Sequence, residues 1–385
     1  MADNMVTYAS ALRDHGYATG YAGKWHLDGP GRPQWEPKRR FGFEDNRYMF
    51  NRGHWKKLVE TPNGPAVGSK NANGQPNYNL AGADDRTFTT DFLADRAVEF
   101  IRSHQGKPFA YHVSIPDPHG PNTVRPPYDS MYDHLDFQKP ESARSKGENL
   151  PAYAATQSGG AGKKQMALYF GMVKCVDDNV GKILNALRET GDLDHTIIVF
   201  TSDHGDLCGE HGRDNKGVPM EASARIPFLI HAPGSIKPGT VVTQSLGSVD
   251  FKPTILSLMG ITDADGPANE GRDASGLFTG KTSGQDWHDV NFVRIGPGMK
   301  NGWFGAFTSR YKLIMAPGAS AAFFDLESDP NEMRNVINLP EHREKIRELA
   351  RDLKVYASKH HDPLLGSTAI QSDLTWAIEG KSSYV

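Results

Sequence analysis

Three features are scarce in this sequence of 385 residues, and each scarcity argues against a class of protein. Only two cysteines occur, Cys175 and Cys208, and they form neither a CxxC pair nor a disulfide framework. No apolar run reaches the roughly 18 residues that a transmembrane helix needs. No extended run of Lys and Arg is present and the net charge is -3, so nothing indicates a nucleic-acid surface.

The start of the sequence carries no targeting signal. Met1 is followed by Ala-Asp-Asn, without the basic and apolar regions of a signal peptide, so export is unsupported and the localisation stays open. Hydrophobic residues make up 37% and charged residues 23% of the chain, and the mean hydropathy is -0.56. This composition is typical of a polar globular protein, and 385 residues can bury a sizeable core.

Helical and extended patterns alternate through about residue 260. That order predicts an α/β sheet with helices on both faces. Within helix 163–190 the expected buried stripe is Met166, Tyr169, Val173, Val176, Val180, Ile183, Leu184 and Leu187, and Gly191 stands at the expected C-terminal cap. The expected helices are 5–16, 90–102 and 163–190, and the expected strands are 17–21, 108–115 and 196–201, the last a central strand covered on both faces.

The last hundred residues have a different pattern, which predicts a small antiparallel sheet with one packed helix. The division expected from this change is a domain over residues 1–282 and a C-terminal subdomain over 283–385. The expected strands are 293–295, 303–308, 311–315 and 322–325, followed by a charged helix over 340–359.

Polar motifs follow the strands of the first domain, where ligands of open α/β sheets bind. In Gly23-Lys24-Trp25-His26-Leu27, the side chains of Lys24 and His26 would face the same way in an extended chain, which suits a cation and a proton-transfer group acting on one anion. Considered alone, this pentapeptide would be interpreted as an exposed lysine beside a histidine whose hydrogen bonds are satisfied within the protein.

Thr201-Ser202-Asp203-His204-Gly205-Asp206 directly follows an apolar strand. Asp203 and His204 can ligate a divalent ion, and Gly205 would let another backbone segment come close. Alone, D-H-G favours an ordinary turn by roughly two to one. The strand before it and Gly209-Glu210-His211-Gly212 after it reverse that preference.

Two further motifs carry one candidate residue each. His119 lies in Asp117-Pro118-His119-Gly120-Pro121, a loop made rigid by two prolines. Lys216 precedes the run E-A-S-A-R-I-P at 221–227. Considered singly, His119 would be interpreted as a surface histidine, and Lys216 would be interpreted as a solvated charge.

In this order the four motifs resemble those of the type I, formylglycine-dependent sulfatases of the alkaline phosphatase superfamily. The resemblance extends through 248–254, 270–272, 309–314 and 324–332 and so covers nearly the whole chain. It implies a central mixed, mainly parallel sheet with helices on both faces, plus a small C-terminal antiparallel sheet and helix. It also implies hydrolysis of sulfate esters, with a sulfated carbohydrate as the expected substrate.

The resemblance assigns roles to single residues. Asp203 and His204 would be two ligands of a calcium ion. Lys24 and Lys216 would hold the sulfate oxygens, and His26 would be the base that serves the nucleophile. His119, together with Lys216, would stabilise or protonate the leaving-group oxygen.

Two parts of the family's site do not occur in these 385 residues. The formylglycine motif, C/S-x-P/A-x-R, fits neither Cys175 nor Cys208, and the paired Asp of a first strand has no counterpart before Gly23. We favour a lost or mis-started upstream segment. A diverged non-catalytic relative and a separately supplied segment are the alternatives. The chain by itself is expected to show little sulfatase turnover.

Two other functions stay open. One is hydrolysis of phosphodiesters or phosphonate monoesters, and the other is anion binding without catalysis. The segments 28–85, 120–162 and 294–303 are expected to shape the substrate pocket. Trp25, Trp55 and Trp303 are candidates for sugar stacking, although packing in the core is the commoner role for tryptophan.

Overall fold

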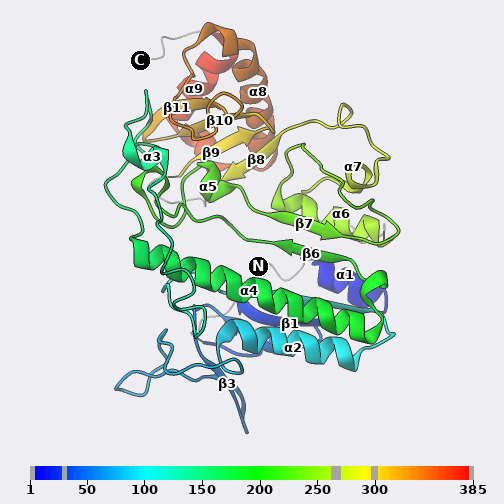
Figure 1. Cartoon of the computed structure of the whole chain (residues 1–385). Coiled ribbons are helices and arrows are strands. Elements are labelled where there is room, and N and C mark those ends of the chain that lie inside the picture. The colour runs from blue at the N-terminus through cyan, green and yellow to red at the C-terminus, as the bar shows by residue number, and fades with distance from the viewer. Residues whose placement is uncertain (1–4, 28–32, 262–269, 296–301, 381–385) are drawn as a thin grey trace. The chain divides into compact units, whose positions relative to one another are not determined.

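The computed structural model describes residues 5–27, 33–261, 270–295 and 302–380, and the chain forms two compact units (Figure 1). Unit 1 contains Met1–Phe137, Gly162–Thr196 and Leu256–Glu270, and unit 2 contains Gln138–Ala161, Ile197–Ile255 and Gly271–Val385. The pocket-shaping residues expected at 28–32 and 296–301 lie outside the described residues. In the part of the chain that is described, no helix is long and apolar enough to cross a membrane.

The elements of each unit follow in chain order. Unit 1 has α1 (Tyr8–Asp14), β1 (Ala18–Trp25), β2 (Asp45–Asn51), β3 (Leu58–Thr61), β4 (Gly64–Val67), α2 (Thr89–Ser103), β5 (Phe109–Ser114) and α4 (Lys163–Thr190). Unit 2 has α3 (Glu141–Arg144), β6 (Ile198–Thr201), α5 (Glu221–Ala224), β7 (Phe228–His231), α7 (Ser275–Thr279), β8 (Asn291–Arg294), β9 (Phe304–Phe307), β10 (Tyr311–Ala316), β11 (Ala319–Asp325), α8 (Arg343–Lys359) and α9 (Thr368–Glu379). Helix α6 (Phe251–Leu258) has residues in both.

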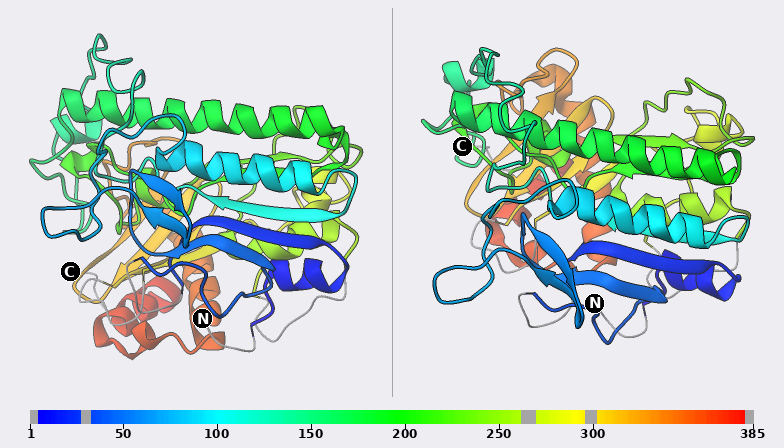
Figure 2. Two further views of the ribbon diagram at one scale, coloured as in Figure 1. Left: turned by 90° about the horizontal axis from the view of Figure 1, so that it is seen from below. Right: turned by 60° about the horizontal axis from the view of Figure 1, so that its bottom comes forward.

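The sheet of unit 1 is parallel, with the strand order β2-β1-β5. Its residues alternate between two helical layers. Tyr21 and Trp25 of β1 pack in one cluster with Ala9 of α1, whereas Ala22 packs with Phe92 of α2. Figure 2 shows α2 and α4 on one face of this sheet and α1 on the other. The predicted α/β architecture with helices on both faces is therefore confirmed.

The bounds predicted for helix α4 are confirmed, since it spans Lys163–Thr190. The predicted C-terminal cap is also confirmed, because Gly191 adopts the left-handed conformation with φ 79°. Its predicted buried stripe is wrong. Of that stripe only Leu187 is fully buried, and Val173 is exposed. The buried face contains Cys175 and Asn179 instead, since the amide of Asn179 donates to the carboxylate of Asp91 on α2 at 3.1 Å. Ala167, Gly171 and Met172 are buried on the same helix.

Strand β6 pairs antiparallel with β7, which is its one paired neighbour among the described residues. Within unit 2, Phe200 and Thr201 at the end of β6 are exposed, and Leu229 of β7 is 62% exposed. The expectation that β6 is a central strand covered on both faces stays a prediction.

The C-terminal part of unit 2 matches its predicted pattern. Strands β8 to β11 form an antiparallel sheet in the order β11-β10-β9-β8, and α8 packs on it through Ile346, Leu349 and Leu353. A second helix, α9, was not expected, and its Ile370 and Leu374 join the same core. The sequence division at 282/283 stays a prediction.

One histidine is enclosed in the core of unit 1. His112 of β5 stacks on Tyr21 with ring centroids 4.8 Å apart, and its Nδ1 lies 2.7 Å from the hydroxyl of Tyr8. Phe43 packs against the same ring. Burial lowers the pKa of His112 to about 4, because the apolar surroundings disfavour the imidazolium.

This burial predicts a loss of stability in acid. The unfolded chain takes up a proton on His112 at higher pH than the folded one, so the free energy of unfolding should fall as the pH drops from about 6.5 to about 4. His112 contributes at most about 1.4 kcal/mol per pH unit. Urea unfolding across this range should show a shallower decline for His112→Phe, whereas the exposed His134→Gln should follow the wild type. Equal slopes for all three proteins would contradict the prediction.

Candidate active site

Three segments that follow or end parallel strands supply the polar groups of unit 1. Lys24 is the penultimate residue of β1, His54 follows the end of β2, and His119 follows the end of β5. The register pairs Lys24 with Phe50 of β2 and Gly23 with Ser114 of β5. Because the strands are parallel, their carboxyl ends meet at one edge of the sheet.

The backbone at Gly23 requires glycine. Its φ is 112°, and a Cβ there would lie 2.0 Å from the carbonyl oxygen of Ser114. The sequence analysis predicted that Lys24 follows the end of a strand, but β1 continues to Trp25. Sheet pairing therefore fixes the backbone of Lys24. The hydroxyl of Tyr21 also donates to the carbonyl of Lys24 at 2.6 Å.

The ammonium of Lys24 lies 3.0 Å from Nε2 of His54. A lysine ammonium has donors and no acceptor, so Nε2 must accept, and His54 is the neutral tautomer with its proton on Nδ1. The imidazole of His54 stacks on that of His119, with centroids 3.5 Å apart and planes 7° from parallel. Lys24 and His119 are therefore brought together through His54, which the sequence analysis missed.

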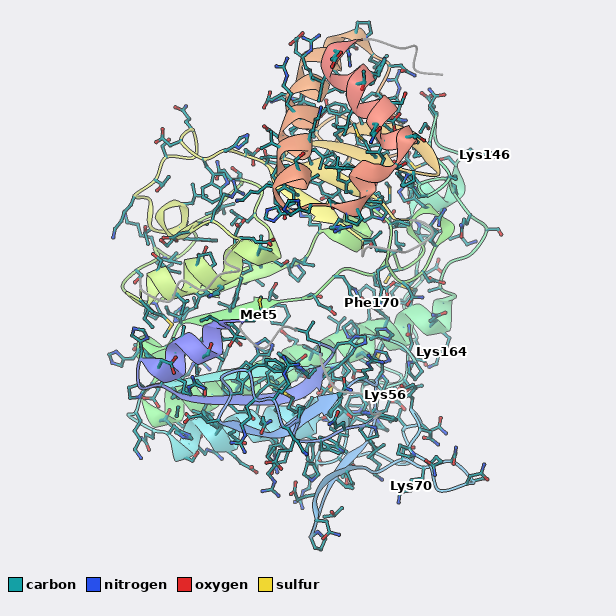
Figure 3. All side chains as sticks on the ribbon, turned by 180° about the vertical axis from the view of Figure 1, so that it is seen from behind. Met5, Lys56, Lys70, Lys146, Lys164 and Phe170 are labelled. Atoms are coloured by element: carbon teal, nitrogen blue, oxygen red, sulfur yellow. The ribbon has the colours of Figure 1, made fainter. Side chains whose placement is uncertain are left out.

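A buried ion pair holds the loop that carries His119. Lys56 is fully buried, and its ammonium donates to Asp117 at 2.5 Å and to the carbonyl of His119 at 3.3 Å. The second oxygen of Asp117 accepts from the hydroxyl of Thr90 at 2.9 Å. Lys56 also approaches Met172 of α4, and Figure 3 labels it beside that helix.

The two histidines predicted to be catalytic, His26 and His119, differ in their surroundings. Nδ1 of His119 donates to the carbonyl of Gly120 at 2.9 Å, which leaves Nε2 as the nitrogen that can exchange a proton. His26 is the first residue after β1 and is exposed.

In unit 2, Asp203 and His204 stand directly after Ser202 at the end of β6. Nδ1 of His204 donates to the carbonyl of Gly205 at 2.7 Å, so Nε2 is the nitrogen that faces other partners. This nitrogen lies 3.4 Å from a carboxylate oxygen of Asp203. The two groups form an ion pair when the imidazole is protonated, and they can also serve as two ligands of a divalent ion. No cluster of three or more such donors occurs among the described residues.

The glycine in this motif has the role expected for it. A Cβ on Gly205 would lie 2.1 Å from the carbonyl oxygen of Ala222, and the amide of Gly205 donates to the carbonyl of Ser223 at 2.9 Å. Asp206 accepts from the amides of Cys208 and Asn215 at 3.1 and 2.9 Å. Asp206 therefore ties this loop to the loop of Lys216.

The loop of Lys216 is anchored on both sides of the lysine. Trp303 donates from Nε1 to the carbonyl of Gly217 at 3.0 Å. The fully buried Lys312 of β10 donates to the carbonyl of Pro219 at 2.6 Å and to Glu332 at 2.7 Å. The C-terminal sheet thus fixes the backbone from which the exposed side chain of Lys216 projects.

A pocket of about 240 Å³ borders Lys216 within unit 2. It includes Arg213 and Asp214 on the same loop. Gln157 and Gly160 line it from the other side and belong to the segment 120–162 that was expected to shape the substrate pocket. The expectation that this segment shapes the substrate pocket stays a prediction.

Other sequence candidates have structural roles. Trp25, Trp55 and Trp303 are 7%, 4% and 4% exposed, so all three pack in cores and sugar stacking is wrong for them. Cys175 is fully buried, and burial raises the pKa of its thiol. Lys56 and His54 were missed because the irregular stretch 28–85 has no periodicity that marks a buried lysine.

The buried pair predicts a large stability loss on removal of one partner. Lys56→Met leaves the carboxylate of Asp117 buried without its cation and should lower the free energy of unfolding by about 3–5 kcal/mol. The neighbouring Lys57, which donates to the exposed carbonyl of Ala81, supplies the matched control. Lys57→Met should change the free energy of unfolding by less than about 0.5 kcal/mol. Chemical denaturation measures both, and similar midpoints for the two variants would contradict this account.

The chain was compared with known families and proteins. The model described as "Sulfatase" matches residues 2–261, and the model described as "N-sulphoglucosamine sulphohydrolase, C-terminal" matches residues 209–359. The arylsulfatase of Clostridium perfringens is 31% identical over 279 residues, which are 69% of this chain and 57% of that protein. The N-acetylglucosamine-6-O-sulfatase of Bacteroides thetaiotaomicron is 30% identical over 215 residues, 52% of this chain and 37% of that protein.

A solved structure agrees with these matches. The sulfatase-like protein yidJ of Bacteroides fragilis superimposes with a TM-score of 0.74 at 25% identity, covering 95% of this chain and 80% of that one. The family model spans well over half of the sequence and includes the strand-end residues Lys24, His119, Asp203 and Lys216. The chain therefore belongs to the sulfatase family of the alkaline phosphatase superfamily.

Proposed function

We propose that this protein hydrolyses sulfate esters. The observation that carries the proposal is the contact of Lys24 with His54 and the stacking of His54 on His119 at one edge of a parallel sheet. A lysine and a histidine with a proton-exchanging nitrogen suit an anion whose leaving group must take up a proton. Membership of the sulfatase family makes that anion a sulfate ester.

The roles proposed for single residues follow the family resemblance. Lys24 and Lys216 hold the sulfate oxygens and offset the charge that develops in the transition state. His119 gives a proton from Nε2 to the leaving-group oxygen, and the role that the resemblance gives Lys216 includes stabilising that oxygen. His26 acts as the base that helps release sulfate from the nucleophile.

Members of this family generally bind a divalent cation, and we propose calcium for this protein. Asp203 and His204 would hold it, and the ion would supply positive charge next to the sulfate oxygens. The nearness of the His204 imidazole to the Asp203 carboxylate, with Nε2 and a carboxylate oxygen 3.4 Å apart, supports the assignment.

The nucleophile is the part that these 385 residues do not contain. No C/S-x-P/A-x-R motif occurs in the sequence, and the buried thiol of Cys175 lies in the middle of α4. We propose that the chain alone binds sulfate esters but turns over little or none of them, because it has no activated nucleophile.

The proposed substrate class is sulfated carbohydrate. It is supported by the N-acetylglucosamine-6-O-sulfatase relative and by the match to the C-terminal model of N-sulphoglucosamine sulphohydrolases. The pocket beside Lys216 is the part of unit 2 that we expect to contact the sugar.

Binding of an aryl sulfate tests the proposed function. The 385-residue protein should bind 4-nitrophenyl sulfate in calorimetry without releasing nitrophenol. Lys216→Ala should raise its dissociation constant about tenfold, the effect of one charge-assisted hydrogen bond, whereas the exposed Lys237→Ala should not. Robust turnover would refute the missing-nucleophile proposal. Tighter binding of phenylphosphonate than of the sulfate would favour the phosphonate hydrolase alternative.

Cation binding is a separate prediction. Terbium luminescence, as a probe of a calcium-type site, should report a weak site, with a dissociation constant on the order of 1 mM, because only two protein ligands are proposed. Asp203→Asn should abolish the signal, and Asp194→Asn, at an exposed aspartate, should leave it unchanged. A signal that persists in Asp203→Asn would place the ion elsewhere.

A further inference from the structure

The segment after β2 holds His54 between two anchored neighbours. Trp55 is 4% exposed and packs on Tyr78 with centroids 4.8 Å apart, and Lys56 is fully buried in its ion pair. Gly53 precedes them with φ 99°, and a Cβ on it would lie 2.4 Å from the indole of Trp55. The backbone therefore has little freedom, and the half-buried imidazole of His54 is held in one place.

The partner atoms of His54 define its chemistry. Nε2 accepts from the ammonium of Lys24 at 3.0 Å, which fixes the neutral tautomer. A carboxylate in this place would offset the charge of Lys24, whereas a neutral imidazole orients the ammonium without doing so. The contact thus orients the ammonium of Lys24.

The ring of His54 makes the second contact. It lies 3.5 Å from the ring of His119 and nearly parallel to it, while Nδ1 of His119 donates to the carbonyl of Gly120. Stacking and hydrogen bond together fix the ring plane of His119 and hence the direction of its Nε2. Lys56 holds the carbonyl of His119 from behind.

We infer that His54 is a positioning residue for sulfate-ester binding and hydrolysis, which aims the ammonium of Lys24 through Nε2 and sets the ring plane of His119 by stacking. The inference rests on the proposed function, since it assigns His54 to the same site. It adds a residue that lies outside the four motifs recognised in the sequence.

Two substitutions separate the two contacts. His54→Gln keeps an acceptor oxygen near the position of Nε2 but removes the ring. His54→Phe keeps a ring against His119 but removes the acceptor. His54→Phe should raise the dissociation constant of 4-nitrophenyl sulfate about tenfold, and His54→Gln should restore it to within about threefold of the wild type. His134→Gln, at an exposed histidine of unit 1, is the matched control.

Nuclear magnetic resonance supplies a readout that does not depend on binding. In the wild type, Nε2 of His54 should have the shift of an unprotonated nitrogen, and Lys24→Met should change that shift. The ring protons of His119 should be shielded by the stacked ring in the wild type and in His54→Phe, and lose this shielding in His54→Gln. A protonated Nε2 on His54 would overturn the inference, even where a variant is too unstable for calorimetry.

The outcomes separate the inference from the proposed function. If the wild type binds the aryl sulfate and both His54 variants bind it as tightly as the wild type does, the proposed role of His54 is overturned. The proposal that the protein binds sulfate esters then still stands. If the folded wild type binds no aryl sulfate, the proposed function fails and the inference fails with it. In a Lys24→Met background the two His54 variants should bind alike, and a persisting difference would contradict an action through Lys24.

Discussion

A buried lysine that must keep a carboxylate partner is the constraint on which the site of unit 1 depends. Lys56 has no exposed surface, so the cost of removing its charge from water is offset only while Asp117 stays at its side. Asp117 is two residues from His119, and Lys56 also binds the carbonyl of His119. The loop can therefore move away only by exposing or unpairing a charge, which makes it a fixed support for the imidazole of His119.

In unit 2, a second buried lysine is also held beside carboxylates. Lys312 is also fully buried, contacts Glu332 at 2.7 Å and Glu221 at 3.0 Å, and donates to the carbonyl of Pro219, three residues from Lys216. Burial raises the pKa of Glu332, and the charge of Lys312 opposes that rise. Because β10 supplies Lys312, the C-terminal sheet acts on the loop of Lys216 as well as forming its own core.

The sequence predicted the elements whose residues repeat with a regular period, and it predicted which strand ends carry polar motifs. It could not predict which face of α4 is buried, because Ala167, Met172 and Cys175 repeat with helical spacing as the expected stripe does, and the Asp91 partner of Asn179 comes from a different helix. The same limit applies to Lys56 and His54. A lysine or histidine in an irregular segment has no pattern that distinguishes a buried partner from a solvated side chain, since the partner comes from a distant strand. Motif order succeeded for Lys24 and His119 because a parallel sheet brings successive strand ends to one edge.

The kind of partner that each lysine contacts separates two uses of the same side chain. Lys56 and Lys312 are buried beside carboxylates, so their charges are offset by ion pairs that hold loops in place. The contact from Lys24 to His54 is to a neutral nitrogen, which directs the ammonium and leaves its charge undiminished by that contact. On this reading His54 belongs to the site for the same reason that Asp117 belongs to the scaffold: each gives a lysine the partner that its task requires.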